Sequence, residues 1–427
     1  MNGRPPMNPM NQPLIYAHAA ESPTEPLVTP EGSPVWPITS QDHLDALTDA
    51  VGNLGGTVTM PRRVIRGTGV HRPRRSGEVF AIAESVHEFA KLYAHLTERA
   101  SVKRASVKAR DDVARHRKME ILIGLYSDLE PKFVDNCYDQ KSRTVPGIIC
   151  ASSGAALLPR ILTRAATLAI RTPPPHSRID FWPAARRFKS ATGPTRDQVI
   201  GALTQGAGVL TLATHGDGID ALLLPELTLC PAVEWVRPLV DTTVAPRCAR
   251  TGYCHRQDLR FEEALAQQRL LTPRAISARV LIAYACWGIL PSQYAIAPSW
   301  GFGGELLASQ RIGALITTRK LEFMMLSVLD ELAKSIANGT PLGRAVQQFN
   351  RSSAASRVGH KLYLFGDPQF SLMSENGPAS TVRRPQKSEA RAKIGATASS
   401  LESNGHLSFL RAFLELVLSG SFCDIRR

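Results

Sequence analysis

The sequence lacks an apolar run of about 18 residues, the minimum that a membrane-spanning helix needs. Residues 1–13 are polar and rich in proline and asparagine, so they also lack the basic start and apolar stretch of a secretory signal peptide. Internal repeats are absent as well. We therefore expect a cytoplasmic protein without a membrane span.

Cysteine is scarce: the chain has seven cysteines in 427 residues, an odd number, and we expect no export signal. This disfavours a disulfide framework and leaves free thiols, a metal site or a catalytic cysteine. Zinc would find four soft ligands in Cys230, Cys248, Cys254 and His255. However, no cysteine pair has the close spacing of zinc motifs, and adjacent Cys254 and His255 cannot easily bind one ion. We therefore expect no required cofactor and do not favour zinc.

Acidic residues are also few, 37 against 51 basic ones, which gives a formal net charge of +14. A basic protein can bind nucleic acid, anionic membranes or acidic proteins. Here the basic residues are spread out and not interleaved with aromatic residues, so nucleic acid is not an expected partner. Basic residues over 103–118 are interpreted as a solvated face, with a surface for an acidic partner as the alternative. The arginine- and alanine-rich composition is typical of a GC-rich bacterial source.

The termini differ in composition from the middle of the chain. Residues 1–76 are predicted to be mostly disordered, because 1–40 are rich in proline and 71–76 resemble a basic linker, with a short helix at 42–51 and a strand at 56–60. Residues 77–140 are predicted to be helical, because Val86, Phe89, Tyr93 and Leu96 recur at three- and four-residue steps. Residues 374–427 are predicted to be a flexible tail with a short apolar helix at 407–418.

Residues 145–373 alternate between apolar strands and helices, which predicts an α/β fold with a mainly parallel sheet flanked by helices. A stretch at about 225–272 interrupts the pattern and is interpreted as an insertion. Thr195 and Gln198 form a capping-box pattern that predicts a helix start. The expected strands are 147–150, 179–182, 208–214, 279–285, 314–318 and 362–365, and the expected helices are 152–170, 195–204, 303–310, 323–337 and 341–349.

Two of these strands end on reactive side chains. Thr214-His215-Gly216 follows one strand, and Ala285-Cys286-Trp287-Gly288 follows another. Ligands of open α/β sheets bind at the carboxyl ends of the strands. A histidine that takes a proton and a cysteine that attacks are the parts that thiol nucleophilic catalysis requires. The sequence therefore predicts a His215–Cys286 dyad.

The order of these motifs resembles the caspase-like cysteine peptidases, most closely the CHAT branch, which is related to gingipains, separases and caspases. The histidine and cysteine motifs match in order. They are followed by 303–317, which resembles the family's helix and strand after the cysteine. Residues 338–346 resemble its later helix pair, and 362–368, ending in Gly-Asp-Pro, resemble its terminal strand and turn. The family is expected to cover about residues 145–373, the caspase-like domain.

The resemblance implies a cysteine endopeptidase that cleaves a partner protein at a restricted site. In it, Cys286 attacks the carbonyl, His215 transfers the proton, and the amides of Gly216 and Cys286 form the oxyanion hole. Asp217 or Asp220 would orient His215 or bind a basic substrate side chain, and Trp287 would line the substrate cleft. Trp287 departs from the small or polar residue usual in the family, and the 71-residue spacing of the dyad is long. The alternative is therefore a catalytically silent interaction scaffold, and a regulatory protein partner stays open.

Overall fold

A computed structural model divides the chain into two compact units, Met1–Ser374 and Glu375–Arg427. Every residue that the structure describes belongs to the first unit, so the predicted tail and its apolar helix lie outside the described residues. The described residues are 14–19, 27–28, 34–38, 41–53, 57–60, 62–63, 65–66, 75–97, 99–104, 119–138, 144–169, 176–180, 195–234, 248, 251–285, 288–289, 301–319, 326–352 and 361–372.

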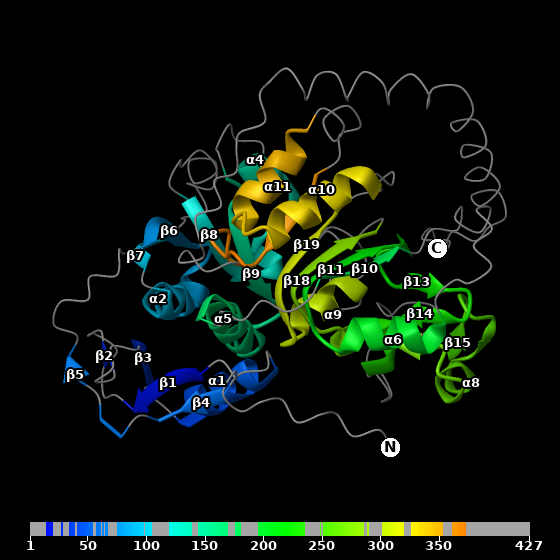
Figure 1. The fold of residues 1–427 in the computed structure, drawn as a ribbon, viewed down its shortest axis with the longest axis horizontal. Helices are drawn as coiled ribbons and strands as arrows, with labels where there is room; N and C mark the ends of the chain where they lie inside the picture. Colours follow the sequence, from blue (N-terminus) through cyan, green and yellow to red (C-terminus); the bar gives the residue numbers. More distant parts are fainter. Residues whose placement is uncertain are drawn as a thin grey trace. The chain divides into compact units, whose positions relative to one another are not determined.

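A five-stranded sheet with the order β10-β11-β18-β19-β20 is the main sheet of the α/β fold (Figure 1). Its parallel strands are β10 (His176–Asp180), β11 (Ala207–Ala213), β18 (Ala278–Tyr284) and β19 (Ile312–Thr317), and β20 (Tyr363–Phe365) pairs antiparallel with β19. Every residue of β11, β18 and β19 is buried. Continuous apolar strands are typical of parallel sheets covered on both faces, so the predicted α/β class with a mainly parallel sheet is confirmed.

Helices pack on this sheet. They are α5 (Gly154–Ala169), α6 (Arg196–Thr204), α9 (Phe302–Ala308), α10 (Leu326–Ala337) and α11 (Leu342–Asn350). The predicted capping box begins α6: the Gln198 amide donates to Thr195 Oγ1 over 3.3 Å, and the Thr195 amide donates to Gln198 Oε1 over 2.8 Å. The elements predicted between 145 and 373 are present with ends shifted by a few residues.

A second sheet, β7-β6-β8-β9, is parallel throughout. Its strands are β6 (Arg75–Ala81), β7 (Arg99–Arg104), β8 (Met119–Leu125) and β9 (Gly147–Ala151). The prediction of a helical region over 77–140 is therefore wrong for three segments. It is right for α2 (His87–Leu96) and α4 (Pro131–Tyr138). Short apolar runs such as the one in β8 do not distinguish a strand from a buried helical turn, which explains the error.

The N-terminal residues contain a third sheet, with the order β4-β1-β3-β2-β5. Its strands are β1 (Leu14–Ala19), β2 (Leu27–Val28), β3 (Pro34–Ile38), β4 (Thr57–Thr59) and β5 (Ile65–Arg66). The expectation of disorder over 1–40 is therefore wrong where β1, β2 and β3 lie. The predicted helix is confirmed as α1 (Gln41–Asn53), and the predicted strand at 56–60 is confirmed as β4.

The β10-β11-β18-β19-β20 sheet and the β7-β6-β8-β9 sheet share one hydrophobic core, which includes Leu122 of β8 and Leu281 of β18. Tyr138 joins them by hydrogen bonds: its hydroxyl donates to the Pro146 carbonyl over 2.8 Å and accepts from the Leu364 amide over 2.8 Å. A Cβ built on Gly147 would lie 1.9 Å from the Gly366 carbonyl oxygen, so the two backbones meet there without room for a side chain. The sheets are therefore packed as one body.

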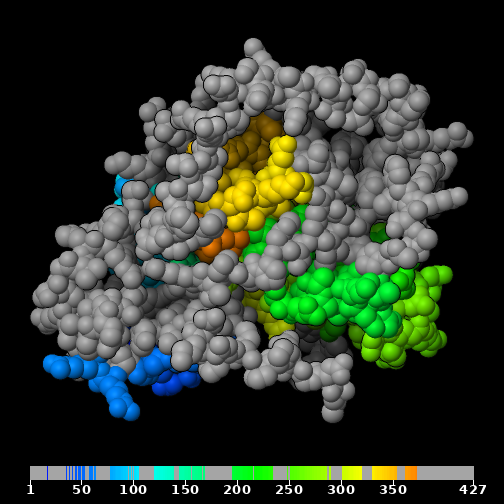
Figure 2. Space-filling view, viewed as in Figure 1, coloured from blue at the N-terminus to red at the C-terminus, as the bar shows by residue number. Residues whose placement is uncertain are grey.

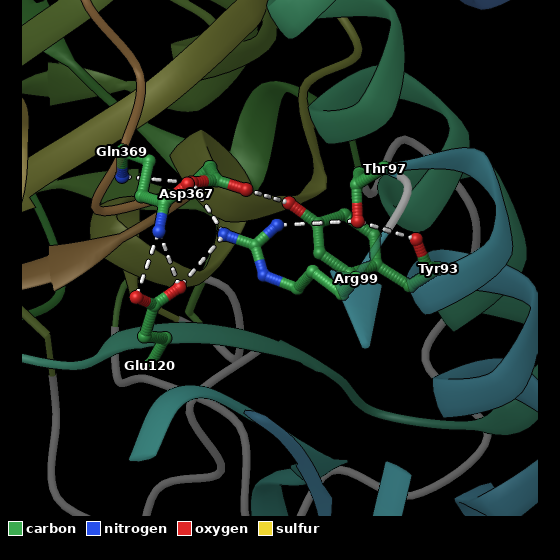
Figure 3. Close-up of polar contacts among 6 residues, drawn as sticks. All are labelled: Tyr93, Thr97, Arg99, Glu120, Asp367 and Gln369. Atoms are coloured by element: carbon green, nitrogen blue, oxygen red, sulfur yellow. Dashed lines mark hydrogen bonds and ion pairs between the residues drawn. The ribbon is translucent and has the colours of Figure 1, made fainter. Parts of the chain in front are cut away.

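A buried polar network fastens the second sheet to the turn after β20 (Figure 3). Arg99 Nη2 lies 3.0 Å from Asp367 Oδ1 and 3.4 Å from Glu120 Oε2, and Tyr93 donates to Asp367 Oδ2 over 2.6 Å. Gln369 closes the network by donating to both Glu120 oxygens over 2.7 Å. The Arg99 side chain is fully buried and that of Asp367 is 2% exposed. Nothing local in the sequence pairs these distant residues.

The described residues of the predicted insertion form small elements with a small core of their own, which includes Cys230, Cys254 and Ala264. A four-stranded sheet, β12-β13-β14-β17, contains strands from before the insertion and from within it. The strands are β12 (His215–Gly216), β13 (Ala221–Leu224), β14 (Leu227–Leu229) and β17 (Leu270–Leu271). Between β14 and β17 lie the paired strands β15 (Tyr253–Cys254) and β16 (Leu259–Arg260) and the helix α8 (Phe261–Ala266). Its exposed residues are visible as light green atoms at the surface (Figure 2).

Candidate active site

The predicted site lies where β11 and β18 end side by side. The two strands are parallel neighbours, with Ala213 opposite Tyr284 at their carboxyl ends. The Thr214 amide then donates to the Tyr284 carbonyl over 3.0 Å, which extends the pairing by one residue. The residues before His215 and before Cys286 are thus adjacent. The backbone of His215 continues into β12, opposite Leu222.

The His215 side chain, Cys286 and Trp287 lie outside the described residues. Their pairing, and the oxyanion role of the Cys286 amide, therefore stay predictions. The described neighbours of these residues define the surroundings instead, namely Thr214 and Gly216 beside His215, and Ala285 and Gly288 on either side of the Cys286-Trp287 dipeptide.

We call residues 285–289 the cysteine loop; its described residues, 285, 288 and 289, are held by Thr318, which follows β19. Its hydroxyl donates to the Ala285 carbonyl and accepts from the Gly288 amide over 3.4 Å, and its carbonyl accepts from the Ile289 amide over 3.0 Å. Thr318 and Ala285 are both buried. Thr318 cannot be identified from the sequence, because only the parallel pairing of β18 with β19 brings it to this loop.

Two glycines allow the cysteine loop to pack against α9. A Cβ on Gly303 would lie 1.7 Å from the Gly288 carbonyl oxygen, and a Cβ on Gly288 would lie 2.1 Å from Thr317 Oγ1. Neither position has room for a side chain. The Gly-rich start of α9 is thus a packing requirement of the predicted site.

The turn after His215 is built by Asp217 and Asp220. Asp217 Oδ1 accepts from the amides of Ile219 and Asp220 over 2.9 and 3.1 Å. The Ile219 carbonyl accepts from the Phe302 amide over 2.9 Å, which joins the turn to the start of α9. Both predicted acidic residues therefore lie in the turn that follows the histidine.

Arg256, from the insertion, pairs with both carboxylates. Its Nη2 lies 2.8 Å from Asp217 Oδ2, and its Nε lies 2.8 Å from Asp220 Oδ1. The Asp220 side chain is 13% exposed. Burial, together with the nearby Asp217 charge, raises the pKa of Asp220 to about 7, although Arg256 opposes the shift. Arg256 cannot be identified from the sequence, because no pattern in the insertion places it near residue 217.

Cys230, Cys248 and Cys254 of the insertion are the cysteines that the sequence offers as zinc ligands. Cys230 and Cys254 are buried thiols, and burial raises the pKa of each above that of an ordinary cysteine. Among the described residues, no group of three or more His, Cys, Asp and Glu side chains is arranged to hold a metal ion.

Of the helices within the described ranges, none is both long and apolar enough to cross a membrane.

No protein-family model matches the sequence, and no curated protein sequence matches it either. Among solved structures, a crystal structure of the Arg-specific cysteine proteinase gingipain R aligns with a TM-score of 0.40 and 10% identity, over 71% of this chain and 80% of that chain. A complex of the pro- and mature domains of RgpB from Porphyromonas gingivalis aligns with a TM-score of 0.40 and 10% identity, over 69% and 79%. A further protease structure aligns with a TM-score of 0.34 and 10% identity, over 69% and 78%. These likenesses are too distant to assign an activity, so the caspase-like resemblance stays a prediction.

Proposed function

We propose that this protein is a cysteine endopeptidase that cleaves a partner protein at a restricted site. Cys286 is the nucleophile, and His215 takes its proton and then donates one to the leaving amine. The amides of Gly216 and Cys286 stabilise the oxyanion, because backbone donors aimed at the developing charge lower the barrier most. Trp287 contributes to the wall of the substrate cleft.

One observation carries this proposal: in their parallel pairing, β11 and β18 end at the same position along the sheet. Paired residues of the two strands differ by 71 positions throughout, as in Ala213 and Tyr284. His215 and Cys286 differ by the same 71 positions, so each comes two residues after the end of its strand. Since the strands are parallel neighbours, this register favours a histidine and a cysteine at the same place on the sheet edge.

For Asp217 and Asp220 we propose a positioning role rather than a substrate-binding one. Both carboxylates are paired with Arg256, and Asp217 also accepts two amide hydrogen bonds from its own turn. A basic substrate side chain would have to displace Arg256 to reach them. The pair is better placed to fix the turn that follows His215.

The proposal is tested by labelling the full-length protein with peptide electrophiles that carry Arg, Lys, Asp or Leu next to the reactive group. We expect covalent labelling at Cys286, found by mass spectrometry of the modified peptide. Labelling should be lost in C286A and strongly reduced in H215A, because the thiolate depends on the histidine. The preferred peptide names the class of the cleaved residue.

Absence of labelling in folded protein, with candidate activating proteins added, would contradict the proposal. The protein would then be better described as a silent scaffold. Labelling of another cysteine, unaffected by H215A, would also contradict it. C137A is a matched control, because Cys137 is a buried thiol with its pKa raised to about 12 and should not react.

A further inference from the structure

Thr318 is bonded to the chain on both sides of the Cys286-Trp287 dipeptide. Ala285, before the dipeptide, accepts a hydrogen bond from the Thr318 hydroxyl. Gly288, after it, donates to the same hydroxyl oxygen over 3.4 Å. Ile289 donates to the Thr318 carbonyl over 3.0 Å. One residue thus binds both ends of the loop that contains the predicted nucleophile.

The chemistry of a hydroxyl suits this position. It donates one hydrogen and accepts others, so a single threonine satisfies a buried carbonyl and a buried amide together. Ala285, Gly288 and Thr318 are all buried, where an unpaired backbone group is costly. Removal of the hydroxyl would leave both groups without this partner and would free the loop ends to move.

The neighbouring Thr317 provides a contrast. It is buried to the same degree, yet its Oγ1 has no hydrogen-bond partner among the described residues. Both threonines lie at the carboxyl end of β19 beside the same loop. The difference between them is the pair of hydrogen bonds that only Thr318 makes.

We propose that Thr318 is a positioning residue for Cys286. By fixing residues 285, 288 and 289, it sets the backbone that presents the thiol to His215. This inference rests on the proposed function, in which Cys286 is the nucleophile. It adds a residue, outside the predicted dyad, that determines how well the dyad is aligned.

The test compares T318V, T318S and T317V in the full-length protein. Valine keeps the size of threonine and removes the hydroxyl, and serine keeps the hydroxyl. The main readout is the rate at which iodoacetamide alkylates Cys286, followed by mass spectrometry across a range of pH, because this rate reports the thiolate without requiring peptidase activity. Labelling by the peptide electrophiles is the second readout.

We expect T318V to slow alkylation of Cys286 at neutral pH by about tenfold and to move the midpoint of the pH profile toward the ordinary thiol value of about 8.5. Misplacement by about 1 Å costs up to about 100-fold in catalysed steps, so peptide labelling should fall by about 10- to 100-fold. T318S should stay within about threefold of the unmodified protein, since the hydroxyl is restored. T317V should change both readouts less than T318V does, because Thr317 packs against Gly288 but its hydroxyl makes no hydrogen bond to the described residues.

Equal alkylation of Cys286 in T318V and T317V would overturn the inference, even if the peptide electrophiles label the protein as proposed. Conversely, a shift in T318V without any peptide labelling of the unmodified protein would support the positioning role and contradict the proposed peptidase. If T318V does not fold, T318A and T318S replace it, and equal alkylation of those two would overturn the inference.

Discussion

The carboxyl group of Asp220, in the turn after His215, makes the folding stability depend on pH. Burial raises the pKa of its carboxyl to about 7, with Asp217 adding to the shift. An acid whose pKa is higher in the folded than in the unfolded state favours folding at low pH, and this contribution is lost as pH rises through the folded value. The window for Asp220 therefore runs from about pH 4, near the unfolded value, to about pH 7.

Replacement of Asp220 by asparagine should remove this pH dependence. We expect the free energy of unfolding of D220N, relative to the unmodified protein, to increase by about 1 to 2 kcal/mol between about pH 5 and about pH 7. Urea unfolding at each pH measures the difference. D197N is the control for loss of a surface carboxylate, because the Asp197 side chain is 86% exposed. Parallel pH curves for D220N and the unmodified protein would show that Asp220 does not titrate in this window.

Individual strands and helices between 145 and 373 could be predicted because their patterns are long or fully apolar. The runs 207–213 and 278–284 are buried at every position, and the capping box at Thr195 marks a helix start by its own hydrogen bonds. The strands β6 and β7 are hard to predict because they lie shortly before and after the helical period of α2, and β8 because its short apolar run does not distinguish a strand from a buried helical turn. All three segments pair with other strands of the chain, which no local pattern encodes.

The sequence indicates the place of a candidate residue only where that residue lies near the end of its own strand. Gly216, Asp217 and Asp220 follow β11 within seven residues, so the strand indicates where their backbone lies. Thr318 and Arg256 reach the same region from other elements through pairings that no local pattern encodes. Residues that position a site are therefore harder to find than residues that carry its chemistry.

The close approach of α9 to the cysteine loop gives a test at the level of one helix. Because a Cβ on Gly303 would lie 1.7 Å from the Gly288 carbonyl oxygen, the backbone must move in G303A. We expect G303A to lower the free energy of unfolding by about 2 kcal/mol or more, since overpacking of this kind is costly. Urea unfolding is the measurement, and labelling of Cys286 should fall in parallel.

G52A is the matched control for G303A. Gly52 lies in α1 with nothing within 4 Å of the Cβ position, so alanine should stabilise that helix by about 0.5 to 1 kcal/mol. Opposite signs for the two substitutions would attribute the loss in G303A to crowding. Equal stability of G303A and the unmodified protein would mean that α9 does not approach the loop this closely.

The whole first unit depends on contacts between sheets that lie far apart in sequence. β6 and β8 contribute to the same core as β11 and β18, and the turn after β20 is tied to β7 and β8 through Arg99 and Glu120. The described residues between 77 and 138 are therefore structural neighbours of the predicted catalytic sheet. Because their removal would expose shared core, a regulatory role for this region must be tested by substitutions that keep the strands.

The buried Arg99–Asp367 ion pair provides a test of whether the sheets depend on one another for stability. Both side chains are almost fully buried, so D367N leaves a buried guanidinium without its nearest carboxylate, although Glu120 still lies 3.4 Å away. Loss of one partner of a buried pair costs about 3 to 5 kcal/mol, and the remaining carboxylate puts the expected loss near the lower value. The free energy of unfolding, measured by urea with probes in both sheets, should fall by about 3 kcal/mol.

The exposed pair of Arg104 and Glu84 is the control for D367N. These groups are 2.7 Å apart, but their side chains are 54% and 71% exposed, so E84Q should change stability by less than about 1 kcal/mol. If the sheets form one cooperative body, D367N shifts the unfolding of both probes together. Separate transitions, with the β10–β20 sheet unaffected by D367N, would instead mean that the second sheet unfolds on its own and that the network fastens a detachable region.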